Sequence, residues 1–92
     1  MIARRLSIHG RVQGVGFRYA MVDQARNAGV TGWVRNRRDG SVEAFVQGPP
    51  ESVLRIVAWT RSGPDSADVT RCEEGDASPD PTLRDFQSRP TA

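Results

Sequence analysis

The sequence predicts an α+β fold in which two helices cover one face of an antiparallel sheet. Apolar residues alternate with polar ones in several short segments, which is typical of strands with one buried face. Two longer segments instead repeat their apolar residues at helical spacing. The segments follow one another as strand, helix, strand, strand, helix, strand, with a weaker fifth strand at the end. This order indicates a split β-α-β arrangement with helices on one side of the sheet.

The first strand and the first helix meet at a glycine-rich turn. The strand is predicted over Ile2 to His9, where Leu6 and Ile8 alternate with polar residues. The helix is predicted over Phe17 to Ala28, because its apolar residues recur at helical spacing and Gly29 is a typical residue just after a helix.

The next two strands are predicted over Thr31 to Arg37 and Ser41 to Gln47, as a hairpin. Val34 shares its parity with the apolar residues of the second strand. Both sets reach one core only if the connection has an odd number of residues. We therefore predict a three-residue loop, residues 38–40, with Gly40 in the left-handed region.

The second half of the chain completes the pattern. Residues 49–51, Pro-Pro-Glu, open a second helix that ends at Gly63-Pro64. A fourth strand is predicted over Ala67 to Cys72 and a loop over Glu73 to Pro81. Leu83 to Ser88 is interpreted as a short fifth strand whose partner is not predicted. The whole order is that of the ferredoxin-like fold, which hosts many functions and by itself defines none.

Composition limits the classes of protein to consider. The 92 residues are enough for one domain, residues 1–92. No apolar run could span a membrane and none resembles a signal peptide, so we expect a cytoplasmic protein. One cysteine, Cys72, and one histidine, His9, exclude a disulfide scaffold and a cysteine-based metal cluster. We expect His9 to lie on the surface of its strand. The net charge of +2 suits an anionic ligand.

The turn GRVQGVGFRYA, Gly10 to Ala20, contains the most informative residues. It lacks the lysine of a Walker loop and the third glycine of a Rossmann turn. Gly14 and Gly16 nevertheless allow backbone N–H groups to converge on an anion at the start of a helix, and Arg18 adds a forked cation. The residues alone fit equally well a plain tight turn beside a solvated arginine.

Three motifs resemble the acylphosphatase family. They are GRVQGVGFR from Gly10 to Arg18, TGWVRN from Thr31 to Asn36, and DGSVE from Asp39 to Glu43. The resemblance implies the ferredoxin-like fold and the hydrolysis of acyl phosphates to a carboxylate and inorganic phosphate. It also implies a reaction that uses no metal and no cofactor.

The resemblance also assigns roles to individual residues. Arg18 is implied to bind the phosphate and Asn36 to position the attacking water; without the resemblance, Asn36 would be interpreted as a polar residue at a strand end. We expect a monomer that binds a small acyl phosphate and is inhibited by inorganic phosphate, with no membrane or nucleic-acid partner. The implied phosphate cradle consists of Gln13, Gly14, Val15, Gly16, Phe17 and Arg18.

Two other classes stay open on the sequence. One is an RNA-binding module of the same fold, because Trp33 and Phe45 share the sheet face opposite Val34 and Val46. The motif of such modules is absent, and only 7% of the residues are aromatic. The other is an anion-binding domain without catalysis, which the presence of both Arg18 and Asn36 disfavours.

Overall fold

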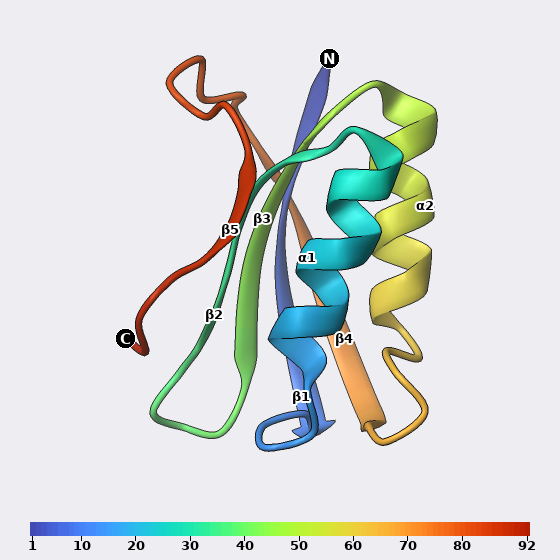
Figure 1. Cartoon of the computed structure of the whole chain (residues 1–92), viewed down its shortest axis with the longest axis vertical. Coiled ribbons are helices and arrows are strands. Elements are labelled where there is room, and N and C mark those ends of the chain that lie inside the picture. Colours follow the sequence, from blue (N-terminus) through green and yellow to red (C-terminus); the bar gives the residue numbers. More distant parts are fainter.

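Seven helices and strands follow one another in the computed structural model, which describes residues 1–92. The predicted order of strands and helices is confirmed, and the fold is the ferredoxin-like α+β fold (Figure 1). No helix is long and apolar enough to cross a membrane. The elements are β1 (Ile2–Arg11), α1 (Phe17–Ala28), β2 (Thr31–Asn36), β3 (Val42–Gly48), α2 (Pro50–Thr60), β4 (Asp68–Ala77) and β5 (Phe86–Ser88).

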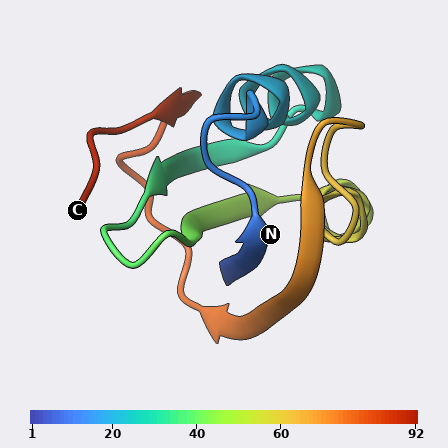
Figure 2. The same ribbon diagram turned by 90° about the horizontal axis from the view of Figure 1, so that it is seen from below.

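The strands form one sheet in the order β4-β1-β3-β2-β5. The four longer strands pair antiparallel, as predicted. The short β5 is parallel to β2, so the sheet as a whole is mixed. Both helices lie on one side of the twisted sheet, which is clearest when the molecule is viewed from below (Figure 2). Because α1 packs against β2 and β5, the end of β2 lies beside the first helix.

The main core lies between the sheet and the helices. It contains 15 buried residues, among them Leu6 and Ile8 from β1, Phe17 and Met21 from α1, and Phe86 from β5. Each large apolar side chain that is removed from water there contributes about 1.5–3 kcal/mol to folding. The core therefore fixes α1 firmly against β2 and β5.

The hairpin between β2 and β3 has the predicted register and loop. The N–H of Arg37 donates to the carbonyl of Ser41 over 2.8 Å, which leaves residues 38–40 as the loop. Gly40 has φ of +94°, a conformation that side chains rarely adopt. The odd loop length brings the apolar residues of β2 and β3 to the same core.

β1 continues to Arg11 rather than ending at His9 as predicted. The pairing with β4 passes through an irregularity between His9 and Gly10 and then resumes. A side chain at Gly10 would clash with the backbone, because its Cβ would lie 2.2 Å from the carbonyl oxygen of Asp68. The longer strand leads the chain directly into the glycine turn.

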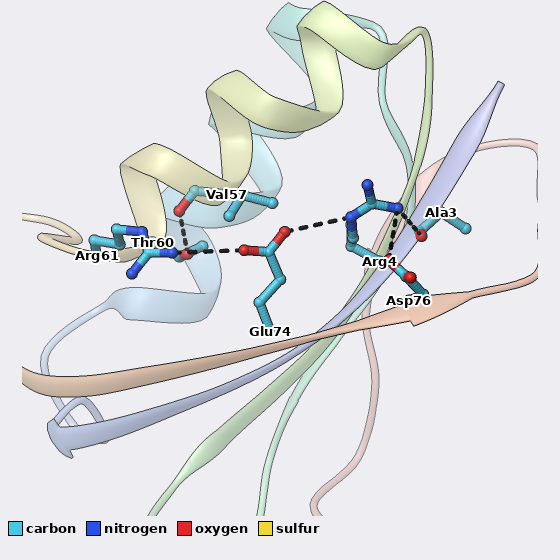
Figure 3. Close-up of polar contacts among 7 residues, drawn as sticks. All are labelled: Ala3, Arg4, Val57, Thr60, Arg61, Glu74 and Asp76. Carbon is cyan, nitrogen blue, oxygen red and sulfur yellow. Dashed lines mark hydrogen bonds and ion pairs between the residues drawn. The ribbon is translucent and has the colours of Figure 1, made fainter.

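The predicted fourth strand, Ala67 to Cys72, was too short: β4 continues to Ala77. Residues 73–77 were predicted as loop, but they pair with β1 as far as Ala3. This edge strand is polar, so apolar alternation does not reveal it. Its charges face Arg4, whose guanidinium lies 3.3 Å from Glu74 and 3.3 Å from Asp76 (Figure 3). Glu74 also meets Arg61, just after α2, at 3.5 Å.

Candidate active site

The main-chain N–H groups of residues 12–16, in the turn between β1 and α1, have no hydrogen-bond partner in the protein. Gly14 and Gly16 have φ of +72° and +78°, both left-handed. Gly16 caps α1 without a side-chain hydrogen bond, and no acidic residue occupies the first turn of the helix. The first N–H groups of a helix have no partner within the helix, and they carry its positive dipole end. The turn is therefore suited to binding an anion.

The side chain of Gln13 connects this turn to the β2–β3 hairpin. Its Nε2 donates to the carbonyl of Arg37 over 2.7 Å and to that of Ser41 over 2.9 Å. These two carbonyls flank the hairpin loop. Both amide hydrogens of Gln13 are thus used within the protein, and they fix the distance between turn and hairpin.

The other side of the turn is held by the core. Phe17 is fully buried and packs against Trp59, with ring centroids 5.3 Å apart. Val15 is half-buried against the core, and its carbonyl accepts a hydrogen bond from Ser66 Oγ over 2.6 Å. The turn is therefore anchored on both sides and does not depend on a ligand for its position.

Arg18 and Asn36 meet at one cavity of about 500 Å³. Arg18 lies in the first turn of α1, and no carboxylate lies within ion-pairing distance of it. Asn36 ends β2 on the same side of the sheet as the buried Val34, because residues two apart in a strand share a face. Both side chains are half-buried and make no hydrogen bond to another group of the protein. They are free to bind a ligand.

The cavity gathers most of the predicted residues. Gly14, Gly16 and Phe17 line it together with Arg18 and Asn36. Gln13 and Val15 do not line it, although the family resemblance implied that they belong to the phosphate cradle. The side chain of Gln13 instead binds the hairpin, and that of Val15 packs against the core.

Five further lining residues were missed by sequence reasoning. Arg18, Val22 and Arg26 are spaced four residues apart, so they form one stripe along α1, and this spacing was visible in the sequence. Ser88 was not predictable, because it reaches the cavity only through the parallel pairing of β5 with β2. The missed residues are Val12, Tyr19, Val22, Arg26 and Ser88.

The charge around the cavity is mainly positive. Arg26 forms two hydrogen bonds to the carboxylate of Asp85, of 3.2 and 3.0 Å. The pKa of Asp85 is lowered from its usual value, first by the N–H of Phe86 and then by Arg26. Arg18 stays unpaired.

His9 lies outside the cavity and contacts Glu73 over 2.9 Å. No group of three or more potential metal ligands is present.

The aromatic pair on the opposite sheet face is nearly covered. Trp33 and Phe45 are 8% and 6% exposed, and their rings stack at 14° with centroids 6.3 Å apart. The guanidinium groups of Arg35 and Arg89 lie over the Trp33 ring at 4.7 and 5.1 Å. Little ring surface is left for a nucleic-acid base, since base stacking needs an open aromatic face. Arg35 and Arg89 thus cover the Trp33 ring, and this disfavours the RNA-binding alternative.

Comparison with known proteins points to one family. The Acylphosphatase family model matches residues 4–88. Acylphosphatase 2 of Ralstonia nicotianae is 54% identical over 86 residues, which cover 94% of this chain and 90% of that protein. The acylphosphatase of Azoarcus sp. is 52% identical over 79 residues, 86% of this chain and 81% of its own. The crystal structure of the Bacillus subtilis acylphosphatase superposes with a TM-score of 0.91 at 32% identity, covering 97% of this chain and 99% of that one.

A ferredoxin-like sheet with a glycine turn suited to an anion, and with two unpaired polar side chains beside it, points to a protein that acts on phosphate groups. The chain belongs to the acylphosphatase family. It has acylphosphatase activity and is a hydrolase, and this confirms the function that the sequence motifs implied.

Proposed function

We propose that Arg18 and Asn36 carry the hydrolysis of acyl phosphates in the cavity between α1 and the end of β2. The main chain around Gly14 and Gly16 provides the phosphate cradle. The observation that carries the proposal is that two half-buried polar side chains without protein partners face the same cavity as the anion-binding turn. Such groups have lost part of their hydration and gain from a ligand that satisfies them.

The phosphoryl group binds first to the cradle and to Arg18. The backbone N–H groups of the turn and the N-terminus of α1 donate to two of its oxygens. The guanidinium of Arg18 donates two parallel hydrogen bonds in the fork geometry that suits phosphate. Gln13 and Val15 contribute through the backbone, because the Gln13 amide is committed to the hairpin and Val15 packs on the core.

Asn36 then orients the attacking water. Its amide oxygen accepts one hydrogen bond from the water and holds the water oxygen opposite the acyl oxygen. The new bond forms between the water oxygen and phosphorus, and the bond between phosphorus and the acyl oxygen breaks. The electron pair of that bond leaves with the carboxylate. One water proton passes to a phosphoryl oxygen, so the products are a carboxylate and dihydrogen phosphate.

This reaction asks the protein mainly for positioning and charge stabilisation. The leaving carboxylate is a weak base, so it departs without taking up a proton. Preorganised donors that hold the phosphoryl oxygens stabilise the charge as it redistributes. We therefore assign no general base, no metal ion and no cofactor.

Finer properties of the protein belong to the same proposal. Residues 1–92 act as one domain and as a monomer in the cytoplasm. Inorganic phosphate, which is the product, binds in the cradle and inhibits. Size-exclusion chromatography at micromolar protein tests the monomer, and a species of twice the mass at all concentrations would contradict it.

The proposal is tested by release of inorganic phosphate from acetyl phosphate and from a phosphate monoester. We expect hydrolysis of the anhydride only. Arg18→Lys keeps the charge but loses the fork, so it should raise KM and lower kcat together. Arg38→Ala is the control, because Arg38 is an exposed cation of the hairpin loop outside the cavity. Equal loss in both variants would contradict the assigned role of Arg18.

A further inference from the structure

The cavity is longer than a phosphate cradle requires. Beyond Arg18 it continues along α1, past Val22 to Arg26. Eight residues of helix separate Arg18 from Arg26, which corresponds to about 12 Å. We name this second part of the cavity the acyl groove and define it by Tyr19, Val22, Arg26 and Ser88.

The acyl groove has an apolar centre. Val22 is half-buried, and its exposed part faces the cavity between two arginines of the same helix stripe. Ser88 forms the facing wall: it follows the buried Phe86 by two residues in β5 and so points to the helix side of the sheet. Serine is short, and it leaves space above Val22.

At the far end of the acyl groove, Arg26 forms a half-exposed ion pair. Arg26 is held by two hydrogen bonds to Asp85, which immediately precedes β5. Its positive charge is therefore largely balanced locally, in contrast to that of the unpaired Arg18. A ligand group at this end meets a neutralised pair, so the groove favours an uncharged chain over a second anion.

We propose that the acyl groove binds the acyl group of the substrate, and that the preferred substrates are phosphates of uncharged carboxylic acids with several carbons. The inference rests on the proposed function, because the phosphoryl group must occupy the cradle for the acyl group to reach Val22. Continuity of the two parts in one cavity supports this occupant. The geometry makes Val22 and Ser88 the residues that determine chain-length preference.

The test is a series of straight-chain substrates: acetyl, propionyl, butyryl and pentanoyl phosphate. Each added methylene that enters the groove should raise kcat/KM, since binding energy shared by ground and transition states raises this ratio. Half to full burial of a methylene corresponds to about a two- to fourfold gain. Succinyl phosphate, which ends in a carboxylate, should gain less than butyryl phosphate.

Two variants should change this gain in opposite directions. Val22→Asn replaces the apolar centre with an amide of similar size and helix propensity. The loss of kcat/KM in Val22→Asn, relative to the unchanged protein, should grow with every carbon added to the substrate. Ser88→Val adds apolar surface to the facing wall and should steepen the gain. Leu54→Asn is the matched control, because Leu54 is an apolar residue of α2 that is 52% exposed and lies outside the cavity.

Competitive inhibition by inorganic phosphate distinguishes failure of the acyl groove from failure of the proposed function. If all four substrates are cleaved equally and phosphate still inhibits, the acyl groove is overturned and the proposed function stands. If phosphate does not bind and no acyl phosphate is cleaved, the proposed function itself fails. Equal effects of Val22→Asn on acetyl and pentanoyl phosphate, with a cooperative thermal transition retained, would also overturn the groove.

Discussion

The side-chain amide of Gln13 donates a hydrogen bond to the carbonyl of Arg37 over 2.7 Å. Arg37 directly follows Asn36, so this bond joins the glycine turn to the strand end that carries the second polar side chain of the cavity. A second bond from the same amide, to Ser41, holds the other side of the hairpin loop. This one side chain therefore links the two halves of the cavity, in addition to the packing of α1 on β2.

Gln13→Met should consequently reduce catalysis. Methionine has a similar shape but cannot donate. The carbonyls of Arg37 and Ser41 then keep only their main-chain partners, and each lost hydrogen bond lowers stability by about 0.5–1.5 kcal/mol. Asn36 should become less well placed, and kcat should fall by about tenfold, because misplacement of a positioned group is costly. The measurement is kcat, KM and the melting temperature of each variant.

Gln47→Met is the matched control. Gln47 is buried and also donates two hydrogen bonds, to Thr31 and to the carbonyl of Asp80, but it lies outside the cavity. Its Oε1 also accepts a hydrogen bond from the N–H of Asp80 over 2.7 Å, so its loss should lower stability at least as much and leave kcat near normal. Equal kcat losses in the two variants would show that Gln13 acts only through stability.

Gly16→Ala should weaken the binding of inorganic phosphate by about tenfold or more. A Cβ at Gly16 would meet no atom within 4 Å, so the effect comes from its φ of +78°. An L-residue pays about 1–2 kcal/mol there, and relaxing the strain turns N–H groups away from the cradle. Isothermal titration with phosphate measures the change.

Gly29→Ala is the matched control, because it introduces the same backbone strain at a position outside the candidate site. Gly29 has φ of +72°, also meets no atom within 4 Å, and lies at the opposite end of α1. Phosphate affinity should stay within twofold of normal in this variant. Unchanged phosphate affinity in folded Gly16→Ala would place the cradle elsewhere.

The hairpin loop should contribute a pH-dependent part of stability through Asp39. Its carboxylate accepts hydrogen bonds from Ser41 Oγ and from the Ser41 N–H, and the first of these is the main cause of its lowered pKa. A lowered folded pKa means stability that is present above the unfolded value, near 3.8, and lost as pH falls through the folded value.

Thermal melts of Asp39→Ala against the unchanged protein check this sign. The unchanged protein should melt higher at neutral pH, and the difference should shrink as the pH falls below about 4. A difference that stays constant down to pH 2 would mean that the charge of Asp39 has no part in it.

Exhaustive chelation should leave hydrolysis of acetyl phosphate unchanged. The reason is chemical: a carboxylate leaves readily, and donors from Arg18 and the backbone supply the charge stabilisation. Phosphate release is measured after dialysis against a chelator, with and without added Mg²⁺. Restoration of lost activity by the metal would contradict the assigned mechanism.

The sequence predicts those parts of the fold in which the spacing of apolar residues matches the periodicity of the helix or strand that they form. Helical spacing and Gly29 give α1 its observed bounds, and the parity of Val34 gives the hairpin loop its length. Residues 73–77 escape prediction because an edge strand is held by main-chain pairing and by charges such as Glu74, without apolar alternation. The short fifth strand was predicted over Leu83 to Ser88 and is observed over Phe86–Ser88, but its parallel pairing with β2 was not predicted, because so short a strand has no periodic signal.

The candidate site divides in the same way. Gly14, Gly16 and Arg18 belong to one continuous motif, which by itself fits an anion site and a plain turn equally well. The family resemblance favours the anion site, and it is the only basis for Asn36, since an asparagine at a strand end has no distinctive pattern. The committed side chain of Gln13 could not be found at all from sequence. Its acceptors are main-chain carbonyls 24 and 28 residues away, which carry no side-chain signature.

The kinetics of Asn36→Ala test the central proposal most directly. Asn36 is assigned to the attacking water and to little of the bound substrate, so its loss should lower kcat by about a hundredfold or more. KM and the inhibition constant of inorganic phosphate should stay near normal, because the cradle and Arg18 are intact. A folded Asn36→Ala protein with near-normal kcat would contradict the assignment and leave only the cradle and Arg18 to account for catalysis.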